Sequence, residues 1–423
     1  MNLHDLSDKE ERDTHHKAGI SGTGASDCLN TSLLSEIPLL SFFTGAGFLD
    51  IGFLQAGFNI IWRNEYNLTF VRGVEHAMAH MPLFHGDNKI HSTASVTELT
   101  ADQVAREAFH NLPRPGIFGV IGGPPCPDFS NGGKHRGREG DHGKLSQVYV
   151  DLIIELQPTF FLFENVPGLL LNEKHRQFFC ELLHKLARDY FIDLNVLNAL
   201  EYGVPQDRER LFLLGFLKRW VAQNEDVPFQ IGSKDWGISP LPIERQRSRT
   251  LVREQHWFPW PQYLYEEAKT RYNWPGRSPF GADAEKPEGI PDELMVGSYI
   301  SDTEGLAQLP NGCDAFQPKS AKFTSIAEGD VTKKSFKRLH RWRYSPAAAY
   351  GHNEVHLHPT EPRRLTVREA LRIQTVPDIY IFPQSMSLST KFKMIGNGVP
   401  VKLAQAIAES FATFLSCEQV PRV

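Results

Sequence analysis

Short apolar runs alternate with helical segments between residues 37 and 217, and this alternation restricts the chain to a small group of folds. The runs are nearly continuous in apolar residues, which is typical of strands buried on both faces of a parallel sheet. They are residues 38–43, 59–63, 116–122, 159–163 and 210–216. Segments between them, such as 99–109 and 175–189, have helical spacing. We therefore predict a doubly wound, mostly parallel, Rossmann-like α/β sheet, with its site at the carboxyl ends of the strands.

The rest of the chain differs in composition from this first part. After about residue 218, Pro, Trp, Arg and Gly are frequent and the periodicity weakens, until helical spacing returns near the end. Thr366 and Glu369 form a capping box at the start of one of these last helices. We predict four parts: a polar extension, a catalytic domain, a smaller irregular domain and a segment that returns to the catalytic domain. Their bounds are 1–36, 37–235, 236–360 and 361–423.

The composition excludes several classes of protein. The net charge of −5 argues against a chain that coats nucleic acid indiscriminately, although a local basic face remains compatible with it. The five cysteines are scattered and form no CxxC pair, which argues against a disulfide framework and a structural zinc ion. No apolar run reaches the roughly 18 residues that span a bilayer. The first residues have no signal-peptide core, so we expect a cytoplasmic protein.

A glycine-rich turn follows the first predicted strand. Gly45, Gly47 and Gly52 lie where a strand gives way to a helix, a place where backbone N–H groups can approach a polar ligand. Glu65 and Asp87 follow at the ends of later strands. A carboxylate at the first of these positions typically holds the hydroxyls of a ribose. Each of these features alone also fits a tight turn or a solvated loop charge, but together they describe a nucleoside pocket.

Cys126 lies in "GGPPCPDFS", just beyond the predicted strand 116–122. A free cysteine is often an inert core residue, whereas the flanking prolines and the downstream cations favour an exposed, reactive thiol. Glu164 ends the next apolar run, where burial would raise its pKa, although a capping or salt-bridging role fits the same position. Arg208 and Arg210 are two residues apart at a strand start, so alternation predicts that both side chains lie on one face.

Six motifs in order make the chain resemble the cytosine-C5 DNA methyltransferases of bacterial restriction–modification systems. They span residues 37 to about 412 and are "FFTGAGFLDIGF", "GGPPCPDFS", "FLFENVPGLL", "YGVPQDRERLFLLG", "RRLTVREALRIQTVPD" and "MIGNGVPVKLAQAIA". The resemblance implies S-adenosylmethionine as the cofactor and double-stranded DNA as the substrate. It also implies a companion restriction endonuclease that acts on the same site. We expect a monomer.

The resemblance assigns roles to individual residues. It implies that Phe43 stacks on the adenine of the cofactor and that Gly45 and Gly47 approach its amino-acid part. The remaining cofactor contacts are expected from Glu65, Asp87 and Asn397. Cys126 is the implied nucleophile, and Glu164, Arg208 and Arg210 are expected around the target base. Ser41 and Phe48 depart from the family pattern, in which an aspartate and a third glycine are common at these positions.

The chemistry explains why these residue types are needed. Carbon 5 of cytosine is a weak nucleophile, and addition of a thiolate at carbon 6 activates it for attack on a methylsulfonium. A proton donor near N3, such as Glu164, stabilises the charge that develops on the ring. Because the carbon is inaccessible inside a duplex, the base must be flipped out. Residues 131–140 are expected to close over the DNA.

The irregular region 236–360 matches the position of the family's target-recognition domain. We predict phosphate contacts there from a basic run, for which a solvated helix face is the alternative. The run contributes Lys334, Lys337, Arg338, Arg341 and Arg343. His352, His356 and His358 have no acid or cysteine cluster around them, so we predict no metal and expect them to pack or to contact DNA at the domain junction.

Three other functions compete with this interpretation. An RNA cytosine-C5 methyltransferase would share the chemistry, but the large insertion with its basic run favours duplex DNA. A nicotinamide-dependent oxidoreductase would share the sheet, but the chain lacks GxGxxG and has the Pro-Pro-Cys-Pro loop. A DNA-binding relative without catalysis would not need Cys126 and Glu164.

Overall fold

The computed structural model describes residues 37–416 except 83–88, 126–140, 224–255, 318–319, 334, 349 and 351–353. Its main body is a six-stranded sheet in the order β2-β1-β3-β4-β7-β5. The strands are β1 (Pro38–Phe42), β2 (Asn59–Asn64), β3 (Gly119–Gly122), β4 (Phe160–Asn165), β5 (Tyr190–Asn198) and β7 (Glu209–Leu217). All neighbours pair in parallel except β7, which is antiparallel to both β4 and β5. The predicted mostly parallel sheet is confirmed.

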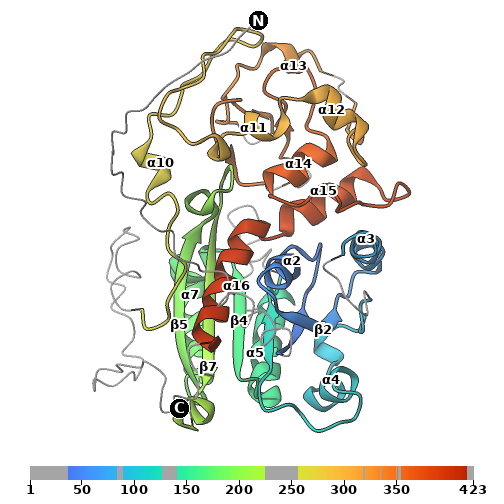
Figure 1. Ribbon diagram of the computed structural model, residues 1–423, viewed down its shortest axis with the longest axis vertical. Helices are drawn as coiled ribbons and strands as arrows, with labels where there is room; N and C mark the ends of the chain where they lie inside the picture. The colour runs from blue at the N-terminus through green and yellow to red at the C-terminus, as the bar shows by residue number, and fades with distance from the viewer. Residues whose placement is uncertain are drawn as a thin grey trace, which may run out of the picture.

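The apolar runs are strands that helices cover on both faces. Residues 160–163 of β4 are completely buried, and all residues of β3 and all of β1 except Pro38 are also buried. The covering helices are α2 (Phe48–Gln55), α4 (Ala101–Ala108), α5 (Asp141–Leu156), α7 (Glu173–Leu186) and α16 (Val401–Ser416), and α3 (Leu68–Met78) packs in a neighbouring cluster with residues of α2. The predicted helices at 99–109 and 175–189 correspond to α4 and α7. Figure 1 shows α16, from the end of the chain, crossing the strands beside α2.

The contact between α2 and α16 requires a glycine. A Cβ on Gly52 would lie 2.5 Å from the Cβ of Ala404 and 2.6 Å from the backbone nitrogen of Gln405. Any side chain at this position would therefore separate the two helices. Gly52, which the sequence grouped with the ligand-approach glycines Gly45 and Gly47, is a packing residue that lets the C-terminal helix α16 lie close to α2.

Short elements join and follow the sheet. Those of the main body are η1 (Val96–Glu98), α6 (Gly168–Leu171), η3 (Ala199–Tyr202), β6 (Gln206–Asp207) and α8 (Lys218–Gln223). The second unit, at the top of Figure 1, contains α10 (Ala268–Arg271), η4 (Asp292–Leu294), α11 (Gly297–Ile300), α12 (Thr303–Gln308), α13 (Lys322–Ser325), β8 (Lys337–Arg338), β9 (Ser345–Pro346), β10 (His356–Leu357), α14 (Val367–Ile373) and α15 (Leu388–Asn397). Its irregular texture agrees with the sequence, because its described strands have only two residues each.

The two units meet along several segments. Trp257 and Phe258 pack on the core of the sheet, where Asp193 of β5 accepts hydrogen bonds from both of their backbone N–H groups. The predicted boundary at 235/236 lies outside the described residues. The predicted capping box is present at α14, where Thr366 and Glu369 each bond the other's backbone N–H. Figure 1 shows α14 and α15 at the level of the second unit, before α16 returns to the sheet.

His356 and His358 are buried in the second unit, with 2% and 1% of their surfaces exposed. The Nδ1 atom of His358 accepts hydrogen bonds from the backbone N–H groups of Thr360 and Glu361. Packing is therefore their observed role, while His352 lies outside the described residues. In the part of the chain that the structure describes, no group of three His, Cys, Asp or Glu side chains could hold a metal ion. None of the described helices is long and apolar enough to cross a membrane.

Candidate active site

A glutamate and an arginine form an ion pair where β4 ends and β7 begins. Because β7 is antiparallel to β4, its first residues lie beside the last residues of β4, and Glu164 faces Phe212 in the register. Arg210 Nε lies 3.0 Å from Glu164 Oε1, and the side chains are only 15% and 12% exposed. Glu164 and Arg210, both predicted site residues, therefore meet in a largely buried position at the carboxyl end of β4.

Burial makes the carboxyl group of Glu164 a weaker acid than a solvated one. The loss of hydration raises the pKa of this carboxyl group above its ordinary value, and the charges of Arg210 and Arg208 offset only part of that rise. A carboxyl group with a raised pKa keeps its proton to a higher pH than a solvated one. Such a group can donate a hydrogen bond to a bound base and receive the proton back.

The chain that leaves β3 passes directly against this carboxyl group. A Cβ on Gly123 would lie 2.6 Å from Glu164 Oε2, so only glycine fits there without a shift. The next residue is also held, since the side-chain amide of Asn165 donates a hydrogen bond to the carbonyl oxygen of Pro124 at 3.3 Å. Cys126, three residues after Gly123, lies outside the described residues, as does the predicted loop 131–140.

Arg208 forms different hydrogen bonds from Arg210, although the charges of both arginines lower the pKa of Glu164. β7 begins at Glu209, so the strand alternation that predicted one shared face for the two side chains does not reach Arg208. Its guanidinium donates hydrogen bonds to three backbone carbonyl oxygens, those of Ala348, Gly396 and Gly398, at 2.8–2.9 Å. Arg208 is 1% exposed and both of its terminal nitrogens are used within the protein.

The predicted nucleoside pocket is built around Glu65. One carboxylate oxygen accepts a hydrogen bond from the N–H of Gly45 at 2.9 Å, and the other accepts one from the N–H of Asn67 at 2.8 Å. Burial raises the pKa of Glu65. Gly45 and Gly47 have φ values of 58° and 72°, the left-handed region that glycine adopts without strain. The structure therefore joins the glycine turn to the acid at the end of β2.

Aromatic rings flank this pocket. The half-buried ring of Phe43 meets Tyr149 edge-on, with centroids 5.5 Å apart. Tyr66, directly after Glu65, is 69% exposed and offers a further aromatic face. Sequence reasoning did not single out Tyr66, although this residue directly follows Glu65. Asp87 lies outside the described residues.

The C-terminal motif packs on the start of α2, directly after the glycine turn. Asn397 is the last residue of α15 and is exposed. A Cβ on the following residue, Gly398, would lie 2.2 Å from the ring of Phe48, so this turn sits tightly on the first residue of α2. Tyr380 meets the same ring edge-on at 5.4 Å, and its hydroxyl donates to the carbonyl oxygen of Ala46 at 2.9 Å. The ring of Phe48, which departs from the family pattern, contacts both Gly398 and Tyr380. It therefore joins the start of α2 to the C-terminal part of the chain.

The other departure, Ser41, belongs to a buried polar network that sequence reasoning missed. Its hydroxyl donates to Asp50 Oδ1 at 2.7 Å, and Asp50 Oδ2 pairs with Arg63 Nε at 3.1 Å. All three residues are at most 2% exposed. Burial raises the pKa of Asp50, against the opposing effects of Arg63 and Ser41. The network fixes α2 against β1 and β2 beneath the glycine turn.

Two of the predicted DNA contacts need correction. Arg338 is completely buried, stacks on the Phe280 ring at 4.2 Å and donates to backbone carbonyl groups, including that of Glu361 at 3.0 Å. Arg341 forms a two-pronged ion pair with the fully buried Glu328. These arginines hold the second unit together, so neither is free to meet a phosphate group.

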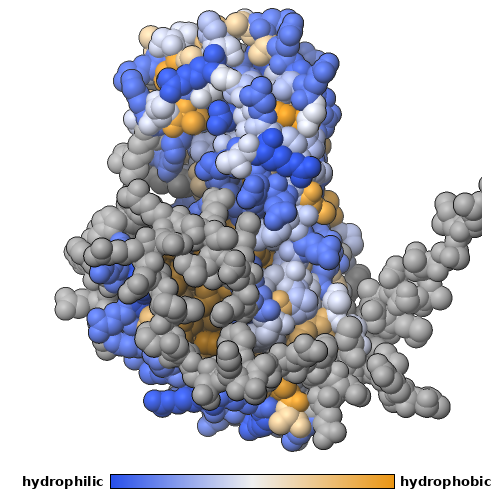
Figure 2. Space-filling model, turned by 90° about the vertical axis from the view of Figure 1, so that its left-hand side faces the viewer, coloured by the Kyte–Doolittle hydropathy of each residue, from blue (hydrophilic) through white to orange (hydrophobic). Residues whose placement is uncertain are grey.

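The three other members of the basic run have different surroundings. Lys337 forms an ion pair with Glu354. Arg343 is half-buried and donates to the hydroxyl of Tyr344 at 3.2 Å. Lys334 lies outside the described residues. On the face drawn in Figure 2, hydrophilic side chains cover most of the second unit, at the top of the view.

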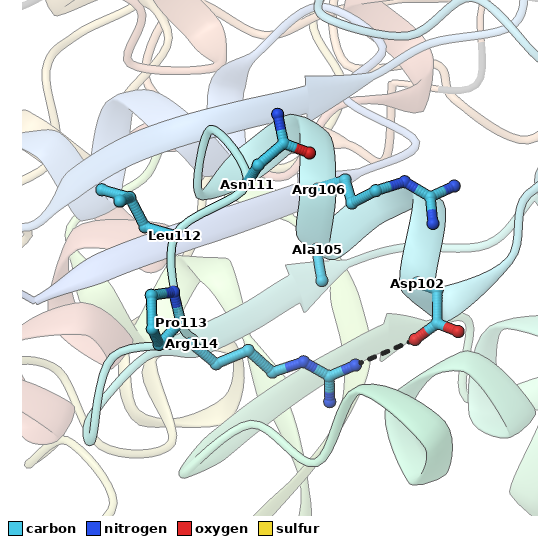
Figure 3. Close-up of a pocket in the computed structure, with 7 residues that line it drawn as sticks. All are labelled: Asp102, Ala105, Arg106, Asn111, Leu112, Pro113 and Arg114. Atoms are coloured by element: carbon cyan, nitrogen blue, oxygen red, sulfur yellow. Dashed lines mark ion pairs between the residues drawn. The ribbon is translucent and has the colours of Figure 1, made fainter.

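A shallow pocket of about 390 Å³ lies far from this chemistry. Its lining residues come from α4 and from the segment that leads into β3 (Figure 3), and they are Asp102, Ala105, Arg106, Asn111, Leu112, Pro113 and Arg114. Arg114 pairs with Asp102 at 3.5 Å and donates to the carbonyl oxygen of Leu156 at 3.0 Å. The segment precedes β3, so this pocket is at the amino ends of the strands, opposite Glu164.

Comparisons with known proteins agree with this geometry. The family model described as C-5 cytosine-specific DNA methylase matches residues 37–413. The Type II methyltransferase M.NmeDI of Neisseria meningitidis serogroup C is 40% identical over 387 residues, which cover 89% of this chain and 84% of that protein. M.FnuDI of Fusobacterium nucleatum, another Type II methyltransferase, is 30% identical, with 88% and 93% covered.

Solved structures show the same fold. The crystal structure of a candidate DNA modification methyltransferase encoded within a prophage (E. coli) matches 90% of this chain and all of that chain, at 24% identity and a TM-score of 0.58. That level of identity supports the fold alone.

Proposed function

Because this chain belongs to the C-5 cytosine-specific DNA methylases, we propose that it uses S-adenosylmethionine and Cys126 to methylate a flipped cytosine in a specific duplex sequence. One observation carries the proposal: the chain that leads to Cys126 is held by Asn165 and passes against the carboxyl group of Glu164, which Arg210 orients. A thiol, a proton donor and a cation would then surround one base.

The residues of the nucleoside pocket fit the cofactor. Glu65 presents a buried carboxylate at the end of β2, the position suited to the hydroxyls of a ribose. Gly45 and Gly47 leave the turn free of side chains, so a ligand can approach the backbone. Phe43 and Tyr66 offer aromatic faces for the adenine, and Asn397 lies on the turn packed against α2. S-adenosylmethionine supplies an electrophilic methyl group when bound.

The remaining steps belong to the protein and the target base. The Cys126 thiolate adds to carbon 6, and Glu164 holds a proton at N3, so the electron pair of the 5,6 double bond becomes available at carbon 5. Arg210 keeps the Glu164 carboxyl group in place and stabilises negative charge on the ring. After carbon 5 is methylated, its proton passes to a water molecule, and the electron pair of that carbon–hydrogen bond re-forms the 5,6 double bond as the carbon–sulfur bond breaks and the thiolate is released.

Replacement of the nucleophile tests this proposal. We predict that Cys126→Ala abolishes methyl transfer to duplex DNA, while S-adenosylhomocysteine binds with unchanged affinity, because the thiol is needed only for activation of the base. The measurement is incorporation of labelled methyl groups together with calorimetric titration of S-adenosylhomocysteine. Near-normal turnover of the variant would rule out this nucleophile.

The substrate and the biological setting need a separate experiment. The matched family and the relatives are DNA methyltransferases, so the RNA alternative is not favoured. We propose that the protein protects a specific sequence from a companion restriction endonuclease. Methylation-sensitive sequencing of DNA from expressing cells should show one methylated sequence, and such DNA should resist an endonuclease of that specificity. Methylation of transfer RNA without methylation of duplex DNA would contradict the proposal.

A further inference from the structure

The Arg208 side chain lies where three distant parts of the chain meet. One terminal nitrogen donates to the carbonyl oxygen of Ala348 at 2.9 Å. The other donates to the carbonyl oxygens of Gly396 and Gly398 at 2.8 and 2.9 Å. These acceptors are 140 to 190 residues away in the sequence. One guanidinium therefore connects the sheet to two parts of the second unit, the segment after β9 and the C-terminal end of α15.

Each of the connected segments has a place in the proposed reaction. Ala348 follows β9 of the second unit, and β9 pairs with β6, the two residues directly before Arg208. The N–H of Ala348 also donates to Gln206 Oε1 at 3.1 Å, so this end of the second unit is docked on the sheet by several bonds. Gly396 and Gly398 flank Asn397, the residue proposed to reach the cofactor.

The acceptors of Arg208 are carbonyl groups, and no carboxylate among the described residues forms an ion pair with it. A buried guanidinium is costly unless its N–H groups are hydrogen-bonded, and in Arg208 the two terminal nitrogens are bonded while Nε has no hydrogen-bond partner among the described residues. Separation of either part of the second unit from the sheet would leave part of this charge without acceptors. The geometry of Arg208 therefore favours one arrangement in which all three segments stay together.

We infer that Arg208 is a positioning residue that holds the second unit, through Ala348 and through residues 396–398 at the end of α15, at the catalytic centre, and that it does not contact the target base. This inference rests on the proposed function, in which Asn397 meets the cofactor and Arg210 serves Glu164. It separates the roles of two arginines that lie two residues apart. Arg210 acts on the reacting groups, and Arg208 sets where the other chain segments lie.

Arg208→Lys tests the inference, because a lysine ammonium is a single point of charge that cannot reproduce the planar fork. Hydrogen–deuterium exchange of the purified full chain should become about tenfold faster in peptides covering both 345–348 and 395–399, with 160–165 unchanged. S-adenosylhomocysteine, titrated without DNA, should bind about tenfold more weakly. The matched control, Arg210→Lys, should lower turnover and leave exchange and S-adenosylhomocysteine affinity unchanged.

A second variant perturbs the same contact without touching Arg208. A Cβ on Gly396 would lie 3.0 Å from the backbone nitrogen of Tyr350 and 3.3 Å from the carbonyl oxygen of Ala348, so Gly396→Ala pushes the end of α15 away from the segment after β9. It should accelerate exchange in the same two peptides, and it carries the test if Arg208→Lys does not fold.

Reduced turnover of Arg208→Lys, with unchanged exchange and unchanged S-adenosylhomocysteine affinity, would overturn the inference and place Arg208 at the base. Failure of the proposed function is a different result: the wild-type protein would then not methylate cytosine in duplex DNA. The exchange measurement does not depend on that activity.

Discussion

Glu164 and Glu328 are glutamates with little or no exposed surface, and each pairs with an arginine. Glu164 pairs with Arg210 at the carboxyl end of β4, and Glu328 pairs with Arg341 in the second unit. Both oxygens of Glu328 bond to Arg341, at 3.0 and 2.8 Å, and one also accepts from the backbone N–H of Arg341 at 2.8 Å. Glu328 is completely enclosed. Glu164 meets Arg210 through one oxygen, while the other lies against the glycine that precedes the Cys126 loop.

The difference shows how one pair of residue types can serve two purposes. A saturated, enclosed pair has no bonding capacity left for a ligand, so it contributes only to the stability of the second unit. The Glu164–Arg210 pair engages only one carboxyl oxygen, and the other oxygen lies next to the backbone of Gly123. Glu164 can therefore exchange a proton with a bound base. The bonding around each carboxylate therefore distinguishes a structural pair from a catalytic one.

The largest expected effect follows from Glu164→Gln. The amide keeps the shape but cannot hold an acidic proton for N3, so kcat for methylation of duplex DNA should fall by about 10²–10⁴-fold. Single-turnover methylation assays measure this effect, with S-adenosylhomocysteine affinity as the control for an intact pocket. A loss of less than fivefold would show that Glu164 is not the proton donor.

Glu328→Gln should have its main effect on stability. The change leaves the Arg341 guanidinium partly buried without its counter-charge, which should lower the free energy of unfolding by about 2 kcal/mol. Urea denaturation monitored by tryptophan fluorescence measures the loss. Well below the denaturation midpoint, kcat should stay within twofold of wild type. If kcat fell as far as in Glu164→Gln with no loss of stability, the contrast between the two pairs would be wrong.

Gly123→Ala should disturb the catalytic pair through space. The new Cβ would lie 2.6 Å from Glu164 Oε2, so the carboxyl group or the Cys126 loop must move. We expect kcat to fall by about 10²-fold, the typical cost of a 1 Å displacement of catalytic groups. The matched control is Gly116→Ala, where an added Cβ would meet no atom within 4 Å. Equal activity of the two variants would mean that Gly123 does not confine the carboxyl group.

The smallest expected effect concerns pH and stability. Burial raises the pKa of Glu164 in the folded protein, so the folded state binds this proton more tightly than the unfolded chain. Its contribution to stability is therefore fully present below the ordinary carboxyl pKa and is lost as pH rises through the raised pKa. Relative to wild type, Glu164→Gln should become more stable with rising pH across that window. Parallel stability–pH curves would contradict the raised pKa.

Local patterns predicted the parts of the fold that depend on local burial. β1, β3 and β4 are nearly continuous apolar runs because helices cover both of their faces, and Glu164 was identifiable because it ends such a run. β5 did not stand out as an apolar run, since it is an edge strand in which buried and partly buried positions mix. Where burial is uneven, the apolar signal weakens.

Long-range contacts decided the residues that sequence reasoning misplaced. Arg208 and Arg338 look like surface cations in the sequence, but each is surrounded by backbone carbonyl groups. The acceptors of Arg208 come from segments at least 140 residues away, which no local pattern can indicate. Phe48 likewise fits only because a glycine from the other end of the chain, Gly398, lies against its ring.

The most direct test of the account is a covalent trap. Duplex DNA that carries 5-fluorocytosine at the methylated position cannot lose a C5 proton, so the carbon–sulfur bond persists after methyl transfer. Mass spectrometry of the digested complex, formed with S-adenosylmethionine, should find the base attached to the peptide containing Cys126, and Cys126→Ala should give no adduct. Attachment to Cys180 or Cys313, or normal methylation of ordinary DNA with no trapped adduct, would contradict the account.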